Sequence, residues 1–163
     1  MLVDFNILSD SSKVWIYQSS REFSKDELKE INIELEKFVA SWKRHGDDLR
    51  ASFQIKYNQF IVLAVDESYN NVSGCSVDAS THIFKQFEKK FQVDLFNKMN
   101  IAFKDGDHIN VVSLSDFQKF VDEQKIDRNT IVFNNLINTK KELETSWEVM
   151  ADESWHNRYF KSH

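Results

Sequence analysis

The sequence predicts an α+β fold with a mixed, mainly antiparallel sheet and helices on one face. A continuous apolar run at residues 60–65 has strand length and predicts a central strand buried on both faces. Pairs of predicted strands alternate with single segments of helical spacing, which is typical of such a sheet. Two connections between predicted strands read as hairpins, and this favours antiparallel pairing.

The length of 163 residues fits a single domain, predicted over residues 1–163. Hydrophobic residues make up 41% and charged residues 29%, as in soluble globular proteins. The net charge of −5 argues against non-specific nucleic-acid binding, and no apolar stretch is long enough to span a membrane. One cysteine and an N-terminus unlike a signal peptide predict a reducing compartment, the cytoplasm.

The predicted elements begin in the order βαββαβ, which indicates a ferredoxin-like core followed by a C-terminal strand and helices. The predicted strands cover residues 14–17, 49–57, 60–65, 100–103, 108–112 and 130–133. In the second hairpin, Gly106 can supply the positive φ that a tight turn requires.

The first helix has the clearest boundaries. Ser24 and Glu27 have the spacing of a capping box, in which each side chain bonds the other residue's backbone N–H. An apolar stripe then runs to Trp42, and Gly46 predicts the end of the helix. Another capping box, at Thr139 and Glu142, predicts a last helix that carries Leu143, Trp147 and Met150.

Residues 66–78 are the first candidate for a functional site. Cys75 precedes a helix predicted over residues 79–91, where the helix dipole and free N–H groups favour a thiolate. Cys75 is therefore a candidate nucleophile, with His82 or His45 as a candidate base. The alternative is a small unreactive cysteine at a strand-to-helix turn, with Ser76 or Asp78 as the helix cap.

The same stretch could hold an anion, because a glycine lets a ligand approach exposed backbone amides. The candidate ligand-binding residues are Ser73, Gly74 and Ser76 for the anion, together with Asp66 and Asp78, whose carboxylates could instead hold a divalent cation or act as a base. The alternative interpretation is turn formation and capping. No P-loop, dinucleotide fingerprint or zinc-binding histidine spacing occurs, so the sequence predicts neither a metal site nor a cofactor.

Three segments resemble a family of short uncharacterised bacterial proteins, some of which carry the name "ABC transporter ATPase". These segments are residues 41–46, 65–67 and 73–78. The resemblance implies a bacterial cytoplasmic protein and brings no catalytic residues. The Walker A lysine loop and the ABC signature do not occur in this chain.

Two hypotheses about function follow. The first is a non-enzymatic binding or interaction module, because no catalytic signature occurs and the aromatic residues could form a partner or homodimer surface. The aromatic tail at residues 154–160 could bind such a partner, fold as a lid over residues 66–78 or dock on the core. A protein partner or a small anionic ligand is expected. The second hypothesis is a small thiol-dependent enzyme that performs acyl transfer or related thiol chemistry through Cys75.

Overall fold

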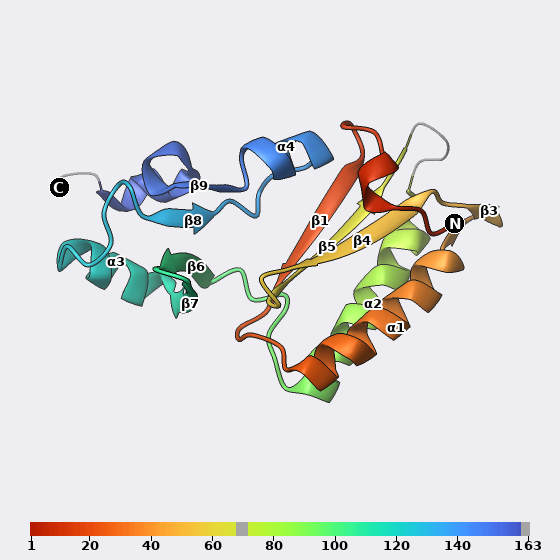
Figure 1. The fold of residues 1–163 in the computed structure, drawn as a ribbon, viewed down its shortest axis with the longest axis horizontal. Coiled ribbons are helices and arrows are strands. Elements are labelled where there is room, and N and C mark those ends of the chain that lie inside the picture. Colours follow the sequence, from red (N-terminus) through yellow and green to blue (C-terminus); the bar gives the residue numbers. More distant parts are fainter. Residues whose placement is uncertain (68–71, 161–163) are drawn as a thin grey trace. The chain divides into compact units, whose positions relative to one another are not determined.

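Residues 1–67 and 72–160 are described by the computed structural model, and they form two units with separate cores (Figure 1). Unit 1 contains Met1–Phe96 and Asn138–Lys141, and unit 2 contains Asn97–Ile137 and residues 142–160. Both units combine antiparallel strands with helices, which confirms the predicted α+β class. The single domain over residues 1–163 stays a prediction.

Strand β5 (Phe60–Val65) lies at the centre of unit 1, between β1 (Lys13–Gln18) and β4 (Ala51–Lys56). Both neighbours run antiparallel to β5. All six of its side chains are fully buried, although successive side chains point to opposite faces of a strand. The predicted central strand, buried on both faces, is therefore confirmed.

One face of this sheet is covered by α1 (Lys25–Ala40) and α2 (Gly74–Phe91), which Figure 1 shows side by side. Each helix places an apolar stripe in a core that it shares with alternate residues of β5. This core includes Ile31, Leu35, Val39, Ile61, Leu63, Val65, Phe84, Phe87 and Phe91. In unit 1 the two long helices therefore pack on one face of the sheet, as the sequence predicted.

The start of α1 is fixed by the predicted capping box. Ser24 Oγ accepts a hydrogen bond from the Glu27 N–H at 3.2 Å, and Glu27 Oε1 accepts one from the Ser24 N–H at 2.8 Å. Arg21 donates to both oxygens of the same carboxylate, each at 2.8 Å. The hydrogen bond from Arg21 is the main reason that the pKa of Glu27 is lowered to about 2.

The end of α1 differs from the prediction of a helix that runs to Gly46. The helix ends at Ala40, and a small hairpin follows, made of β2 (Lys43–Arg44) and β3 (Asp47–Asp48). Its turn residues, His45 and Gly46, have φ angles of 50° and 88°. Positive φ at both central residues is the mark of the type I′ turn, which suits two-residue hairpins. Gly46 therefore serves a strand turn and not a helix end.

Each outer strand of the unit 1 sheet gains a short neighbour from elsewhere in the chain. Leu2 forms a parallel bridge with Ala51 of β4, and Lys13 of β1 forms an antiparallel bridge with Thr139. These bridges cover one end of each outer edge.

Lys140 anchors the second of these covering segments. Its side chain is buried, and the ammonium group donates to the carbonyl oxygens of Asn6 and Leu8, at 3.1 and 2.8 Å. A buried ammonium group needs such acceptors, because it has lost its hydration. The segment Asn138–Lys141 thus belongs to unit 1, although the chain before it belongs to unit 2.

Unit 2 is built on an antiparallel sheet in the order β7-β6-β8-β9. The strands are β6 (Asn100–Asp105), β7 (His108–Ser113), β8 (Ile131–Phe133) and β9 (Glu148–Met150). Strands β6 and β7 form the predicted hairpin, and Gly106 in its turn has a φ of 62°. The expected role of this glycine is confirmed.

The unit 2 core forms between this sheet, α3 (Leu114–Asp122) and the C-terminal 3-10 helices η2 (Ala151–Glu153) and η3 (Trp155–Phe160). Its residues include Ile101, Phe103, Phe117, Ile126, Val132 and Ala151, with Trp155, Tyr159 and Phe160 packed against them. The aromatic tail therefore docks on the core of its own unit.

The last predicted helix is wrong in its second half. Helix α4 (Lys140–Thr145) ends early, and Glu148–Met150 pairs with β8 as a strand. Val149 lies opposite Val132, and the Trp147 ring packs on Phe133 with centroids 4.8 Å apart. Packing against β8 outweighs the helical spacing of these apolar residues.

The predicted ferredoxin-like βαββαβ core is not confirmed. Strands β1, β4 and β5 and helices α1 and α2 follow the predicted order within unit 1. The next strand, β6, pairs with β7 and β8 in unit 2 and does not join β1. Two sheets of three and four strands, and the β2–β3 hairpin, replace the single predicted sheet in the described part of the chain.

Replacing Ser24 with alanine tests the capping box. The change removes the acceptor for the Glu27 N–H and should lower the free energy of unfolding by about 1 kcal/mol. Urea unfolding followed by circular dichroism measures this. Glu36→Ala, at an exposed position of the same helix, should change the value by less than about 0.5 kcal/mol. Equal effects of the two substitutions would contradict a specific contribution from the cap.

Candidate functional site

Cys75 lies in the first turn of α2, and its side chain is exposed. The helix begins at Gly74, and its N-cap is Ser73, whose Oγ accepts from the Ser76 N–H at 3.2 Å. The sequence placed the thiol near the start of this helix correctly. It predicted the wrong cap, because Ser76 or Asp78 was expected in place of Ser73.

Ser76 ties this end of α2 to the segment that follows α1. Its Oγ donates to the Lys43 carbonyl at 2.8 Å, and its own carbonyl accepts from Trp42 Nε1 at 2.9 Å. Ser76 and Trp42 are both buried. These contacts give Ser76 a structural role and remove it from the surface that a ligand could reach.

The two candidate bases occupy different elements. His82 is seven residues beyond Cys75 in α2, a rise of about 10.5 Å, and its Nε2 lies 3.2 Å from Gln86 Nε2. His45 is in the turn of the β2–β3 hairpin. Among the described contacts, neither imidazole hydrogen-bonds to the thiol. The described residues therefore contain no thiol–imidazole pair of the kind that activates a nucleophile.

The candidate ligand-binding carboxylates, Asp66 and Asp78, also differ in their surroundings. Asp66 is buried, its N–H donates to the Arg50 carbonyl at 2.9 Å, and its carboxylate lies 3.9 Å from Arg50 Nε. Gly74 and Asp78 are exposed in the first turns of α2. Residues 68–71 of the predicted loop lie outside the described residues.

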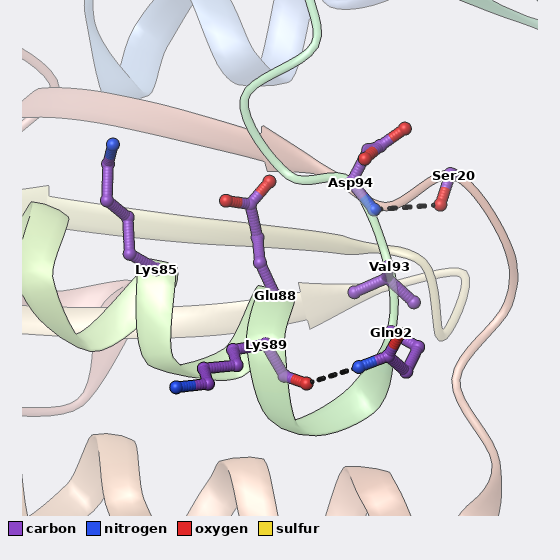
Figure 2. Close-up of a pocket in the computed structure, with 7 residues that line it drawn as sticks. All are labelled: Ser20, Lys85, Glu88, Lys89, Gln92, Val93 and Asp94. Carbon is purple, nitrogen blue, oxygen red and sulfur yellow. Dashed lines mark hydrogen bonds between the residues drawn. The ribbon is translucent and has the colours of Figure 1, made fainter.

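A recess of about 600 Å³, open to solvent, lies at the other end of α2 (Figure 2). We call it the α2 recess. It is lined by Ser20, Lys85, Glu88, Lys89, Gln92, Val93 and Asp94. All of these residues belong to unit 1.

Hydrogen bonds fix the backbone of the α2 recess. The Asp94 N–H donates to Ser20 Oγ, and the Ser20 N–H donates to the Asp94 carbonyl, both at 3.0 Å. Glu88 Oε2 accepts from the Leu95 N–H at 2.8 Å, which holds the chain where it turns back from the helix. Gln92, the C-cap of α2, has a φ of 55° and donates from Nε2 to the Lys89 carbonyl. The wall of the recess is therefore a stretch of backbone that hydrogen bonds hold in place.

The charged groups of the α2 recess are of both signs. In Figure 2 the Lys85 ammonium and the carboxylates of Glu88 and Asp94 stand along one rim, with Lys89 below them. Lys85, Lys89 and Asp94 are exposed, and none of their charged groups has an ion-pair partner within the described residues. Lys85 Nζ lies 5.6 Å from the centroid of the Phe96 ring. These side chains can therefore contact a ligand without first breaking an ion pair.

The α2 recess was not predicted from the sequence. The four-residue spacing of Lys85 and Lys89 places them on one helix face, and that signal was present. Ser20 and Asp94 are 74 positions apart, and no pattern in the sequence connects them.

His156 is a second polar group that the sequence did not single out. It is fully buried in unit 2, with Nδ1 2.8 Å from Ser154 Oγ and the ring stacked on Trp155. Its Nε2 has no hydrogen-bond partner within the described residues. Burial, together with the charge of Arg158, lowers the pKa of His156 to about 4. The imidazole is therefore neutral at pH 7 and packs as a core residue.

The described residues contain no group of three or more His, Cys, Asp and Glu side chains that could hold a metal ion. They also contain no helix with the length and apolar character to cross a membrane. The chain matches no protein-family model, no curated protein and no solved structure. The resemblance carried by residues 41–46, 65–67 and 73–78 therefore stays a prediction.

The buried imidazole predicts an acid-dependent loss of stability. Between pH 6.5 and 4 the unfolded chain binds a proton at His156 that the folded chain does not bind. The free energy of unfolding should therefore be highest above pH 6.5 and fall by about 3 kcal/mol as the pH decreases to 4. Urea unfolding across this range measures the effect.

His156→Phe should remove this part of the pH dependence, and His108→Gln, which changes an exposed imidazole, should keep it. The same pH dependence in the wild type and in His156→Phe would contradict the assignment.

Proposed function

We propose that this chain is a non-enzymatic binding module that takes a small ligand of mixed charge in the α2 recess. The proposal rests on one observation. The exposed ammonium groups of Lys85 and Lys89 and the exposed carboxylate of Asp94 line the same recess, whose backbone is held by hydrogen bonds. A small anionic ligand was expected at residues 66–78, and the proposed site is instead at the opposite end of α2.

The two lysines supply the anion-binding part. Lys85 and Lys89 are four residues apart on α2, so their Cβ atoms are about 6 Å from each other. Lys85 and Lys89 point in different directions in Figure 2, and a carboxylate or phosphate group can accept hydrogen bonds from both when the Lys89 side chain turns toward Lys85.

Asp94 supplies the cation-binding part. Its exposed carboxylate lies beside the C-terminal end of α2, which carries partial negative charge from the aligned peptide dipoles. A ligand ammonium group is favoured there by both sources of charge. Together the two parts favour a zwitterion over a simple anion.

The size and rigidity of the α2 recess support this proposal. A volume of about 600 Å³, open to solvent, leaves room for a small polar ligand. The paired hydrogen bonds between Ser20 and Asp94 hold the wall in place, which lowers the entropy lost on binding.

Phosphoethanolamine is a suitable probe, because it carries a phosphate and an ammonium group on a short chain. In ¹⁵N-labelled protein it should shift the amide resonances of Ser20, Gln92 and Asp94. It should bind more tightly than inorganic phosphate or ethylamine, each of which presents only one of the two charges.

The double substitution Lys85→Gln and Lys89→Gln should weaken phosphoethanolamine binding about tenfold, because each exposed charge pair contributes up to about 1 kcal/mol. Lys90→Gln is the matched control, since Lys90 is adjacent, carries the same charge and pairs with Glu30 outside the recess. Equal weakening by both changes, or shifts confined to other residues, would refute the proposed site.

The alternative function is thiol-dependent acyl transfer at Cys75, and the observation that favours it is the exposure of this side chain at the start of α2. Under the binding-module proposal, wild type and Cys75→Ser hydrolyse p-nitrophenyl acetate at the same rate. Iodoacetamide should label Cys75 in the folded chain, because the side chain is exposed. Turnover that depends on Cys75 would favour the alternative.

Two further expectations are carried as proposals. A cytoplasmic location is supported by the presence of one cysteine, and the absence of a nucleic-acid partner by the net charge of −5. A distant ferredoxin-like relationship of unit 1 is supported by its strand order β1-β5-β4, in which the third predicted strand lies between the first two.

A further inference from the structure

We propose that two copies of this chain associate as a two-fold dimer through the outer edge of β7 in unit 2. This interface is separate from the α2 recess. The proposal rests on the direction of the β7 peptide groups, the lack of a neighbour beside them among the described residues and the fit of the strand to a second copy of itself.

Two backbone hydrogen bonds show which residues of β8 point their N–H and C=O groups toward β9 and which point them toward β6. The Ala151 N–H donates to the Thr130 carbonyl, and the Asn134 N–H donates to the Trp147 carbonyl. Hydrogen-bonded pairs recur at every second residue of an antiparallel ladder. Val132 lies two residues after Thr130 and two before Asn134. It therefore directs its N–H and C=O groups toward β9, as they do.

The alternation then passes across β6 to β7. Phe103 lies opposite Val132, which does not bond toward β6, so Phe103 bonds to Asn110 on its other side. The neighbours of Asn110, Ile109 and Val111, consequently point their N–H and C=O groups away from β6. Neither of these two residues has another hydrogen-bond partner among the described residues.

Strand β7 differs from the other edge strands. The outer edges of β1 and β4 are covered at one end by the bridges to Thr139 and Leu2. Strand β9 has three residues and includes the charged Glu148. Strand β7 has six residues and, over the part of the chain that the structure describes, pairs only with β6. Long uncharged edges of this kind readily add another strand.

A second β7 can pair with this edge in more than one register, and the proposed register is centred on Asn110. With Asn110 on the two-fold axis, Ile109 of each copy lies opposite Val111 of the other. The outward N–H and C=O groups of these two residues then form four hydrogen bonds. Such an interface is isologous, because each copy contributes the same strand.

The charges in this register are also compatible. Residues 109–113 carry no charged side chain, so the two strands do not repel each other. Asp107 of each copy lies opposite Ser113 of the other, the N-cap of α3. A carboxylate beside that helix start is favoured by the helix dipole. These complementary features favour a second copy of the chain as the partner.

Light scattering coupled to size exclusion, applied to the full chain, tests the proposal. The mass should rise with concentration from 19.3 kDa toward twice that value. Val111→Pro removes an outward N–H and leaves the β6–β7 ladder bonds intact, a position that tolerates proline. This variant should stay monomeric, with an unchanged circular dichroism spectrum.

Met150→Pro is the control on the opposite edge. Its φ of −62° already suits proline, and its N–H points away from β8, so this variant should still form dimers. A wild-type mass that stays at 19.3 kDa at every concentration would overturn the proposal. A dimer that survives Val111→Pro would overturn it as well.

Disulfide trapping keeps the test valid if Val111→Pro fails to fold. In a Cys75→Ser background, Asn110→Cys should cross-link two copies on oxidation, because the Cα atoms of a residue on the axis are about 4.5 Å apart. His108→Cys lies about 14 Å from its own copy and should not cross-link. Equal cross-linking of the two variants, or none in either, would refute the register.

Discussion

The fold of unit 1 depends on the need of β5 to bury both of its faces. Hydrogen bonds to β1 and β4 satisfy its backbone on both edges, and one row of its side chains lies under α1 and α2. The two helices must therefore stay side by side, and polar contacts hold them at both ends. Ser76 binds the Trp42 indole at one end, and Arg21 donates to the Phe91 carbonyl at the other, at 2.6 Å. The opposite ends of the α2 helix consequently have different roles.

At the N-terminal end of α2, most of the unusual side chains are used by the fold. Ser73 caps the helix, Ser76 bonds to the segment after α1, and Asp66 bonds through its backbone to Arg50. At the C-terminal end, the structural contacts are made by backbone groups and by the side chains of Ser20 and Glu88. The charged groups of Lys85, Lys89 and Asp94 remain exposed, which is the reason that the recess is the better candidate site.

Local signals in the sequence predicted the features that depend on neighbouring residues. The Ser24 cap, the turn at Gly106 and the apolar strand at residues 60–65 each need only a few consecutive side chains. Features set by distant contacts were not predictable. Glu148–Met150 has helical spacing but pairs with β8, and the burial of His156 depends on packing in unit 2. The α2 recess needs Ser20 and the end of α2 together, and no local pattern shows this.

The return of Asn138–Lys141 to unit 1 has a consequence for synthesis of the protein. A ribosome makes residues 1–96 before it makes Lys140. The hydrogen bonds from the Lys140 ammonium to the carbonyls of Asn6 and Leu8 therefore form only after residues 97–137 have been translated. The N-terminal unit therefore cannot reach its final structure as an early, independent product of translation. Its completion is delayed until most of the chain has emerged, and a chain truncated after Phe96 would lack this anchor.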